Sequence, residues 1–182
     1  MSTRGLCGFR KNGQDKLAYN HCDSYPDGLG NDIVGLCRQT SIEQFNKAFD
    51  AIVLIPYGTE ATSEQVKEVG STWSTFDVPA GETTDWCYLL DKAEGKLESY
   101  TEGGLTFMVD SADFIKSSLF CEWAYIINLD TNKLEIWNGW RKHPSKNNRY
   151  GTEKRDGCYP CKMIKEFDLG SIPEDWLQSV SE

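Results

Sequence analysis

Residues 121–140 carry the clearest alternation of apolar and polar positions in the chain. Apolar side chains recur at every second position from Trp123 to Leu129 and again from Leu134, and the polar run Asp130–Lys133 separates the two stretches. A period of two is typical of a strand with one buried face, and a short polar run between two strands is typical of a turn. We therefore predict a β-hairpin over residues 121–140.

A second hairpin is predicted at the start of the chain. Two strand-like runs, Thr3–Arg10 and Lys16–His21, flank Asn12-Gly13. Asn-Gly is favoured in two-residue hairpin turns because both residues tolerate a positive φ. The return strand then delivers the polar segment Asn20–Gly30 at its exit. A further strand is predicted over Cys161–Leu169.

Apolar residues at helical spacing lie between the two hairpins. Asn31 or Asp32 is expected to cap a short helix that ends at Arg38. Thr40 or Ser41 is expected to cap the next helix, in which Ile42, Phe45, Phe49 and Ile52 fall on one face. The other elements expected are helices over Thr62–Val69, Asp85–Glu94 (capped by Thr84) and Pro173–Val180, extended pieces at Leu97–Tyr100 and Leu105–Val109, and a long loop over Arg141–Gly157.

These elements predict one α+β domain over residues 1–182. Its sheet, antiparallel or mixed, is built from the N-terminal hairpin, the 121–140 hairpin and the 161–169 strand, and helices cover it. No repeat or linker interrupts the chain.

Composition and charge narrow the range of functions. The net charge of −9 argues against broad binding to nucleic acid, which requires many Lys and Arg side chains. No apolar run approaches the length of a membrane span, and the N-terminus has no apolar signal-peptide centre. We therefore expect a cytoplasmic protein, in the host cytoplasm if a phage encodes it, with its seven Cys as free thiols.

The segment Asn20–Gly30 holds the main candidates for function. Its polar side chains are Asn20, His21, Asp23, Ser24, Tyr25 and Asp27. The imidazole of His21 suits proton transfer, while the carboxylates of Asp23 and Asp27 can accept hydrogen bonds from a ligand. The alternative is a turn whose side chains serve only the backbone geometry. On a strand Asn20 and His21 point to opposite faces, so both line one site only if the chain bends there.

Four strings carry a resemblance to a known family. They are Arg4-Gly5, YNHCDSYPDGLG at residues 19–30, DWCYLL at residues 85–90 and EWAYIINLD at residues 122–130. In these strings the chain resembles a family of uncharacterised proteins that occurs in phages, bacteria and fungi. The resemblance implies that residues 19–30 matter for function, and it implies no particular reaction.

The opening strand also resembles that of N-terminal nucleophile hydrolases, in which a terminal nucleophile precedes a hairpin with a polar strand end. That resemblance implies Ser2 as the nucleophile once Met1 is removed, its own amine as the base, and Arg4 and Asp23 as site partners. The chain departs from the similar amidohydrolases, whose nucleophile is Cys, because Cys7 is internal.

Two further motifs have alternatives. Cys158-Tyr-Pro-Cys161 is half of a zinc site or two free thiols that flank a proline turn, and the missing second pair favours the thiols. The basic residues of the 141–155 segment form a phosphate-binding loop or a solvated one. They are Arg141, Lys142, Lys146, Arg149, Lys154 and Arg155. The sequence indicates no cofactor and no bound metal.

Three functions remain open. The first is a small-molecule site, hydrolytic or not, in which Arg4 and the 20–30 segment meet an aromatic wall from Trp86 or Trp123, with a small polar ligand as partner. The second is a non-enzymatic acidic interaction protein, such as a phage-type inhibitor of a host or defence factor. The third is a structural subunit of an oligomer, although the sequence does not give the oligomeric state. The first ranks slightly above the second.

Overall fold

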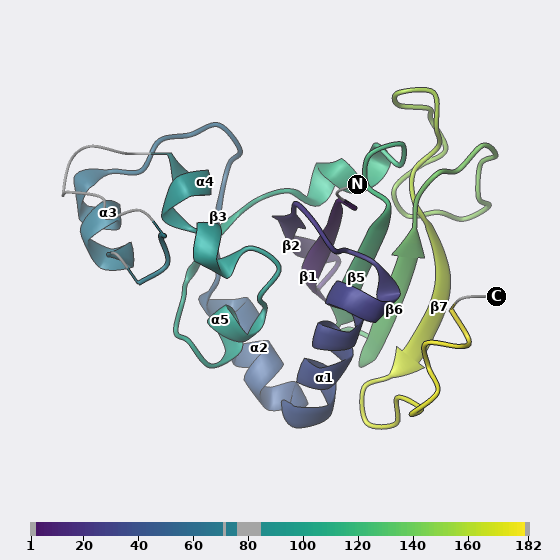
Figure 1. The fold of residues 1–182 in the computed structure, drawn as a ribbon, viewed down its shortest axis with the longest axis horizontal. Helices are drawn as coiled ribbons and strands as arrows, with labels where there is room; N and C mark the ends of the chain where they lie inside the picture. Colours follow the sequence, from purple (N-terminus) through teal and green to yellow (C-terminus); the bar gives the residue numbers. More distant parts are fainter. Residues whose placement is uncertain (1–2, 71, 76–84, 181–182) are drawn as a thin grey trace.

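A mixed sheet of five strands forms the centre of the molecule (Figure 1). The structure, a computed structural model, describes residues 3–70, 72–75 and 85–180. The strands lie in the order β2-β1-β5-β6-β7. Their bounds are β1 Gly5–Lys11, β2 Gln14–Asn20, β5 Trp123–Asn128, β6 Lys133–Asn138 and β7 Lys162–Asp168. The α+β class is as predicted, and the sheet is of the mixed kind.

Both predicted hairpins are confirmed. β1 pairs antiparallel with β2 through a turn at Asn12 and Gly13, whose φ angles are 53° and 73°, and β5 pairs antiparallel with β6. The two turns are joined, since the Asp130 carboxylate accepts hydrogen bonds from the backbone N–H groups of Asn12 (2.6 Å) and Gly13 (3.1 Å). These hydrogen bonds lower the pKa of Asp130. One acidic side chain therefore fixes the relative positions of two hairpins that are far apart in the sequence.

The sheet becomes mixed because β1 lies parallel to β5, with Gly5 opposite Trp123. This parallel pair joins the two hairpins into one sheet. β7 then adds antiparallel to β6, which confirms the strand predicted over 161–169, and the segment between β6 and β7 is the long loop that was predicted.

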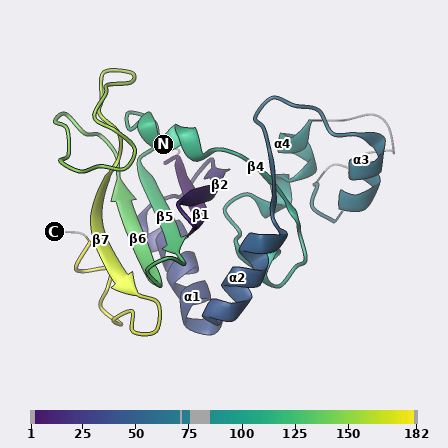
Figure 2. The same cartoon turned by 180° about the vertical axis from the view of Figure 1, so that it is seen from behind.

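Helices α1 and α2 cover one face of the sheet, and a smaller lobe lies beyond the β2 edge (Figure 2). This lobe is formed by the elements from β3 to β4 in chain order, and these two strands pair as a second, parallel sheet. The remaining elements have the bounds η1 Pro26–Gly30, α1 Asn31–Gln39, α2 Ile42–Ala51, β3 Val53–Ile55, α3 Ser63–Val69, α4 Trp86–Leu89, η2 Asp91–Ala93, α5 Glu98–Thr101, β4 Phe107–Val109 and η3 Ala112–Lys116.

The capping signals of the first helices have mixed outcomes. Ser41 caps α2 in a capping box with Gln44, as predicted, and Thr62 and Gln65 cap α3 in the same way. Asn31 is not a cap. It lies inside the helix, and its side-chain amide donates to the carbonyl of Asp27 (2.9 Å), so the chain enters α1 directly from η1.

Three predicted elements are wrong. The helix expected over 85–94 is split into α4 and η2, and Asp85 caps it; Thr84 lies outside the described residues. The 97–100 stretch, expected to be extended, contains the start of helix α5. The helix expected after Pro173 is a series of turns with hydrogen bonds three residues apart, which place Trp176 and Val180 in the core. Burial of these two side chains outweighs helical propensity in this segment.

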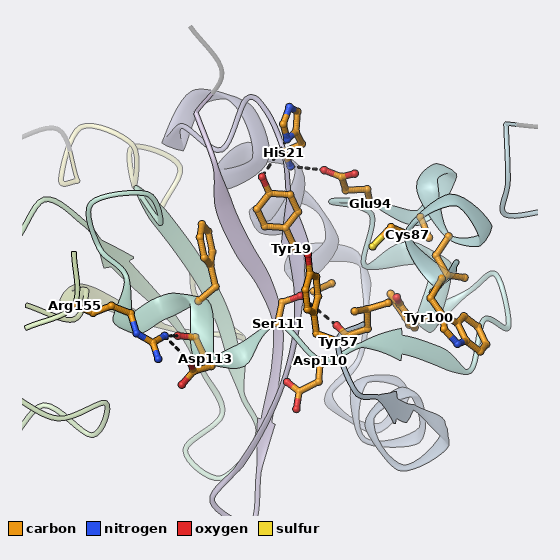
Figure 3. Close-up of a pocket in the computed structure, with 16 residues that line it drawn as sticks. Tyr19, His21, Tyr57, Cys87, Glu94, Tyr100, Asp110, Ser111, Asp113 and Arg155 are labelled. Carbon is orange, nitrogen blue, oxygen red and sulfur yellow. Dashed lines mark hydrogen bonds and ion pairs between the residues drawn. The ribbon is translucent and has the colours of Figure 1, made fainter. Parts of the chain in front are cut away.

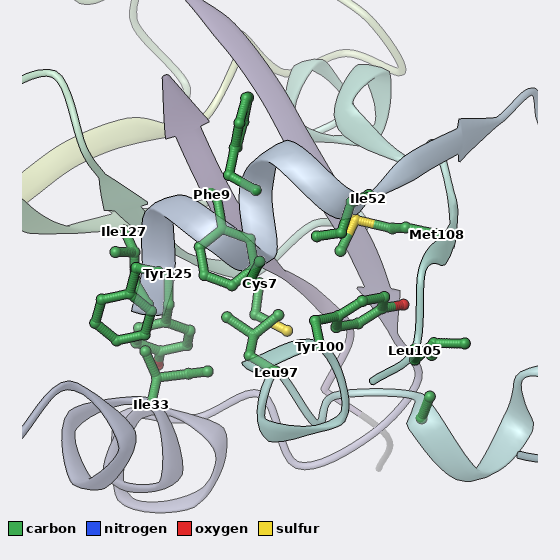
Figure 4. Packing of buried hydrophobic residues seen from close by; sticks show 14 of the residues in the cluster. Cys7, Phe9, Ile33, Ile52, Leu97, Tyr100, Leu105, Met108, Tyr125 and Ile127 are labelled. Atoms are coloured by element: carbon green, nitrogen blue, oxygen red, sulfur yellow. The ribbon is translucent and has the colours of Figure 1, made fainter. Parts of the chain in front are cut away.

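Alternate side chains of the central strands enter two separate apolar clusters. On one face Phe9, Tyr125 and Ile127 pack against α1, α2 and the lobe, and Figure 4 shows them with Ile33 and Leu97 in this core. The other face forms a smaller cluster around Leu6, Ile126 and Trp137, which is covered by η3 and the loop before β7. Because both faces are covered, β1 and β5 are buried on both sides.

Lys16 links β2 to the end of α2. Its buried ammonium donates to the carbonyls of Phe49 (2.8 Å) and Ile52 (2.6 Å), where a helix has carbonyls without partners of their own. Lys16→Met is expected to lower the free energy of unfolding by about 1–3 kcal/mol, because it leaves buried acceptors unsatisfied. Urea denaturation of this variant gives the value.

Lys11→Met is the matched control for Lys16. Lys11 approaches the same helix end but forms an exposed ion pair with Asp50 (2.7 Å). A pair of this kind contributes at most about 1 kcal/mol. An equal loss of stability in the two variants would contradict the role assigned to Lys16.

Within the described residues, no helix is both long enough and apolar enough to cross a membrane.

Candidate functional site

Asn20 and Ser24 fix the backbone of the 20–30 segment. The buried hydroxyl of Ser24 accepts from the side-chain amide of Asn20 (2.7 Å). The backbone N–H of Ser24 donates to the carbonyl of Thr3 (3.2 Å), and its carbonyl accepts from the hydroxyl of Tyr125 (3.0 Å). The segment is thus attached to Thr3, just before β1, and to β5, and the side chains of Asn20 and Ser24 hold the loop in place.

The glycine of the Arg4-Gly5 pair makes this attachment possible. A Cβ atom at position 5 would lie 2.7 Å from the Cβ of Ser24 and would also meet the carbonyl oxygen of Trp123. Such distances are too short for carbon and oxygen atoms in contact. The role of Gly5 is therefore to admit the 20–30 segment against the sheet.

Asp23, Tyr25 and Asp27 have exposed side chains. Asp23 has a φ of 57° and accepts at its carbonyl from the backbone N–H of Leu29 (2.9 Å), which closes the loop onto itself. Tyr25 is 41% exposed. Arg4 lies with its guanidinium 5.0 Å from the ring of Phe120. Ser2, the expected nucleophile, lies outside the described residues.

The predicted site residues do not share one cavity. Two cavities are formed near this segment: the first is lined by His21 and Trp86, and the second by Asp27 and Trp123. The remaining candidates with described positions, Arg4, Asn20, Asp23, Ser24 and Tyr25, line neither. The 20–30 segment passes from one cavity to the other, and the two Trp side chains serve as walls of different cavities.

The first cavity has a volume of about 690 Å³ and lies between β2 and the lobe. Five aromatic residues from five different parts of the chain form its walls: Tyr19, Tyr57, Trp86, Tyr100 and Phe114. Figure 3 shows Tyr19 and His21 on one side of it, Glu94 and Cys87 across from them, and Arg155 with Asp113 at the opposite end. Its size and its aromatic lining are those of a small-molecule site.

The polar groups of this cavity are fixed by hydrogen bonds. Nδ1 of His21 lies 3.1 Å from the hydroxyl of Tyr19, and the backbone N–H of His21 donates to the carboxylate of Glu94. A carboxylate oxygen of Asp110 accepts from the backbone N–H of Ala112 (3.1 Å). The carboxylates of Glu94 and Asp110 are thus held in position by backbone N–H groups rather than by a positively charged side chain.

Charge in the cavity is unevenly compensated. Asp113 forms ion pairs with Lys116 (2.8 Å) and Arg155 (2.5 Å), and these partners lower the pKa of its carboxyl group. Glu94 and Asp110 form no ion pair with any residue that the structure describes. The cavity is therefore aromatic and carries excess negative charge.

Two ionisable groups of this cavity, the Cys87 thiol and the Tyr19 phenol, have raised pKa values. Burial raises the pKa of the Cys87 thiol, and the neighbouring carboxylates of Asp85 and Glu94 raise it further. Burial likewise raises the pKa of the Tyr19 phenol, although the positive charge of Arg4 opposes this. A nucleophilic Cys needs a lowered pKa, and the pKa of Cys87 is shifted in the opposite direction.

The two motifs outside the 20–30 segment have structural contacts. Cys158 and Cys161 are buried free thiols, and within the described part of the chain no group of three or more His, Cys, Asp or Glu side chains is placed to hold a metal ion. The basic residues of the 141–155 segment are dispersed. Arg149 pairs with a buried Glu135, Arg155 with Asp113, and Lys154 lies 5.2 Å from the ring of Tyr159.

Most residues of the first cavity carried no signal in the sequence. Tyr57, Glu94, Asp110 and Phe114 come from four separate loops or short helices, and their spacing matches no motif. The lining residues that fall in strings or sets that the sequence singles out are Tyr19, His21, Trp86, Cys87, Leu90 and Arg155.

Compared with protein-family models, with curated proteins and with solved structures, the chain gives no match.

Proposed function

We propose that this protein binds a small organic cation with an aromatic or apolar body in the cavity between β2 and the lobe. The observation that carries the proposal is an aromatic cavity in which Glu94 and Asp110 form no ion pair with the described residues. Aromatic faces attract cations, and a carboxylate in a partly desolvated site pairs strongly with one.

Two further properties support a cationic ligand. The net charge of −9 attracts cations over long range and raises their rate of association. Burial raises the pKa of the Cys87 thiol, and the contribution of the Asp85 and Glu94 carboxylates to the same shift is the effect that a negative potential in the site produces.

The test compares two probes that differ mainly in charge, tryptamine and its neutral analogue tryptophol. Isothermal titration calorimetry is expected to show that tryptamine binds at least about tenfold more tightly, which corresponds to about 1.4 kcal/mol. Tryptamine should also raise the thermal midpoint, since a ligand of the native state stabilises it.

Variants of this cavity locate the binding. Glu94→Gln keeps an acceptor for the backbone N–H of His21 and removes the charge, so tryptamine is expected to bind about tenfold more weakly. Ala18→Phe places a ring in the cavity from β2 and should abolish binding. Glu153→Gln, on an exposed loop position, is the control for charge and should bind as the unmodified protein does.

Equal affinities for tryptamine and tryptophol, or no binding of either at millimolar concentration, would refute the proposal. In the second case a non-enzymatic acidic interaction protein becomes the better account, because an acidic surface needs no occupied cavity to bind a basic partner.

A further inference from the structure

We propose that the second cavity binds a small organic carboxylate with an apolar body, and that Arg141 is the residue that holds the carboxylate group. This site is separate from the first cavity, so the proposal stands or falls independently of the cation site between β2 and the lobe. The cavity has a volume of about 670 Å³.

The second cavity lies on the same sheet face as α1. The C-terminal segment that closes it runs beside β7 (Figure 1). Pro26 and Asp27 reach it from η1, Trp123 and Asn138 from β5 and β6, and Ile164 from β7. It is thus formed where five parts of the chain meet, and its walls combine apolar side chains with few charged ones.

Arg141 is held in a fixed position at this cavity. Its Nε–H donates to the carbonyl of Asn138 (3.0 Å), and one of its terminal nitrogens donates to the side-chain oxygen of the same residue. Its backbone is fixed as well, by the hydroxyl of Ser118 (3.2 Å) and by the backbone N–H of Tyr159 (2.9 Å). Contacts of this kind pre-organise the guanidinium and leave its remaining N–H groups for a ligand.

The positive charge of Arg141 is not compensated by the described protein. Arg141 is half-buried, and it forms no ion pair with any residue in the ranges 3–70, 72–75 and 85–180. Burial lowers the pKa of its guanidinium, which is the direction that partial desolvation of a positive charge produces. A partly buried cation without a partner is costly, and an anionic ligand would remove that cost.

The other lining residues indicate which anion fits. Trp123, Ile164 and Val180 offer apolar contact to a body of one ring or a branched chain. Asp27 lies in the same cavity, and its charge disfavours an anion with more than one negative charge. A carboxylate, which carries one negative charge, therefore suits this cavity better than a phosphate. A ligand that also carries an ammonium group, such as an amino acid, can use Asp27 as a second contact.

Calorimetry with four probes tests this site: 3-phenylpropionate, 3-phenylpropanol, phenylalanine and inorganic phosphate. We expect 3-phenylpropionate to bind at least about tenfold more tightly than 3-phenylpropanol, which has the same body without the charge. Arg141→Met should remove this preference. Lys154→Met removes one positive charge from the same loop but outside the cavity, and this variant should retain the preference for 3-phenylpropionate.

Further variants separate the possible ligands and guard against a folding defect. If the natural ligand is a zwitterion, Asp27→Asn should weaken the binding of phenylalanine. The same variant should bind 3-phenylpropionate with unchanged or higher affinity. Arg141→Lys keeps the charge but loses the planar fork, so it should bind 3-phenylpropionate with intermediate affinity. Circular dichroism of each variant shows whether it is folded.

Three results would overturn the proposal. One is equal binding of 3-phenylpropionate and 3-phenylpropanol, or no binding of either at millimolar concentration. Another is unchanged binding of 3-phenylpropionate in folded Arg141→Met. The third is tighter binding of inorganic phosphate through Arg141, which would assign the site to a different anion.

Discussion

Replacing Arg149 with methionine is expected to lower the free energy of unfolding by about 3–5 kcal/mol, because it leaves a buried carboxylate without its counter-ion. The carboxylate is that of Glu135, whose side chain is 4% exposed. Both terminal nitrogens of Arg149 donate to it, at 2.9 and 2.5 Å.

The surroundings of Glu135 explain why the loss is large. Its two oxygens also accept from the side-chain amide of Asn128 (2.7 Å) and from the indole N–H of Trp137 (3.0 Å). The site is therefore built around a charged carboxylate, and neutral donors alone do not replace the ion pair. The same arginine lies 4.6 Å from the ring of Trp137, so its removal also exposes the apolar cluster beneath the loop.

Urea denaturation measures the effect, and two further variants interpret it. Glu135→Leu together with Arg149→Met removes both charges and should recover most of the loss, since a buried pair is often replaceable by apolar side chains. Arg155→Met breaks a surface pair with Asp113 and should cost no more than about 1 kcal/mol. If Arg149→Met costs as little as Arg155→Met, the buried pair of Arg149 and Glu135 is not a major source of stability.

The same pair predicts a dependence of stability on pH. Burial by itself raises the pKa of Glu135, but the hydrogen bonds from Arg149 and Asn128 outweigh it, so the pKa is lowered in the folded protein. A lowered pKa contributes stability above the unfolded value of about 4.3, and this contribution is lost as the pH falls through the folded value. The unmodified protein should therefore lose stability more steeply below about pH 4 than the double variant does.

The local part of the fold was predictable from the sequence. The turns are encoded locally, by Asn12-Gly13 and by the run Asp130–Lys133. The alternation of apolar and polar residues on either side of each turn predicts two strands that pair with each other. The parallel pairing of β1 with β5 was not predictable. It joins residues more than a hundred positions apart, such as Phe9 and Ile127, and depends on which face each hairpin buries.

The candidate site was less predictable than the fold, because polar side chains in a turn serve two purposes with the same residue types. Asn20 and Ser24 have the composition of a ligand site, yet their hydrogen bonds go to the protein itself. Glu94 and Asp110, which carry the excess charge of the first cavity, are single residues in separate loops. Only the packing of the lobe against β2 brings them together, and no local sequence pattern predicts that packing.

Trp86→Ala is expected to lower the free energy of unfolding by about 3–5 kcal/mol and to abolish tryptamine binding. Trp86 is 2% exposed, and its ring centroid lies 5.0 Å from that of Phe107. It belongs to the main apolar cluster and also lines the first cavity, so one side chain supports both the lobe and the proposed ligand site.

Phe107→Ala separates these two roles of Trp86. Phe107 is buried beside Trp86 in the same cluster but does not line the cavity. Its replacement should lower the free energy of unfolding by a similar amount, about 3–5 kcal/mol. Calorimetry at a temperature where both variants remain folded should then find tryptamine binding lost in Trp86→Ala and retained within a few fold in Phe107→Ala. Equal loss of binding in both would mean that the cavity depends on the stability of the lobe, and the indole of Trp86 would no longer count as a wall that contacts the ligand.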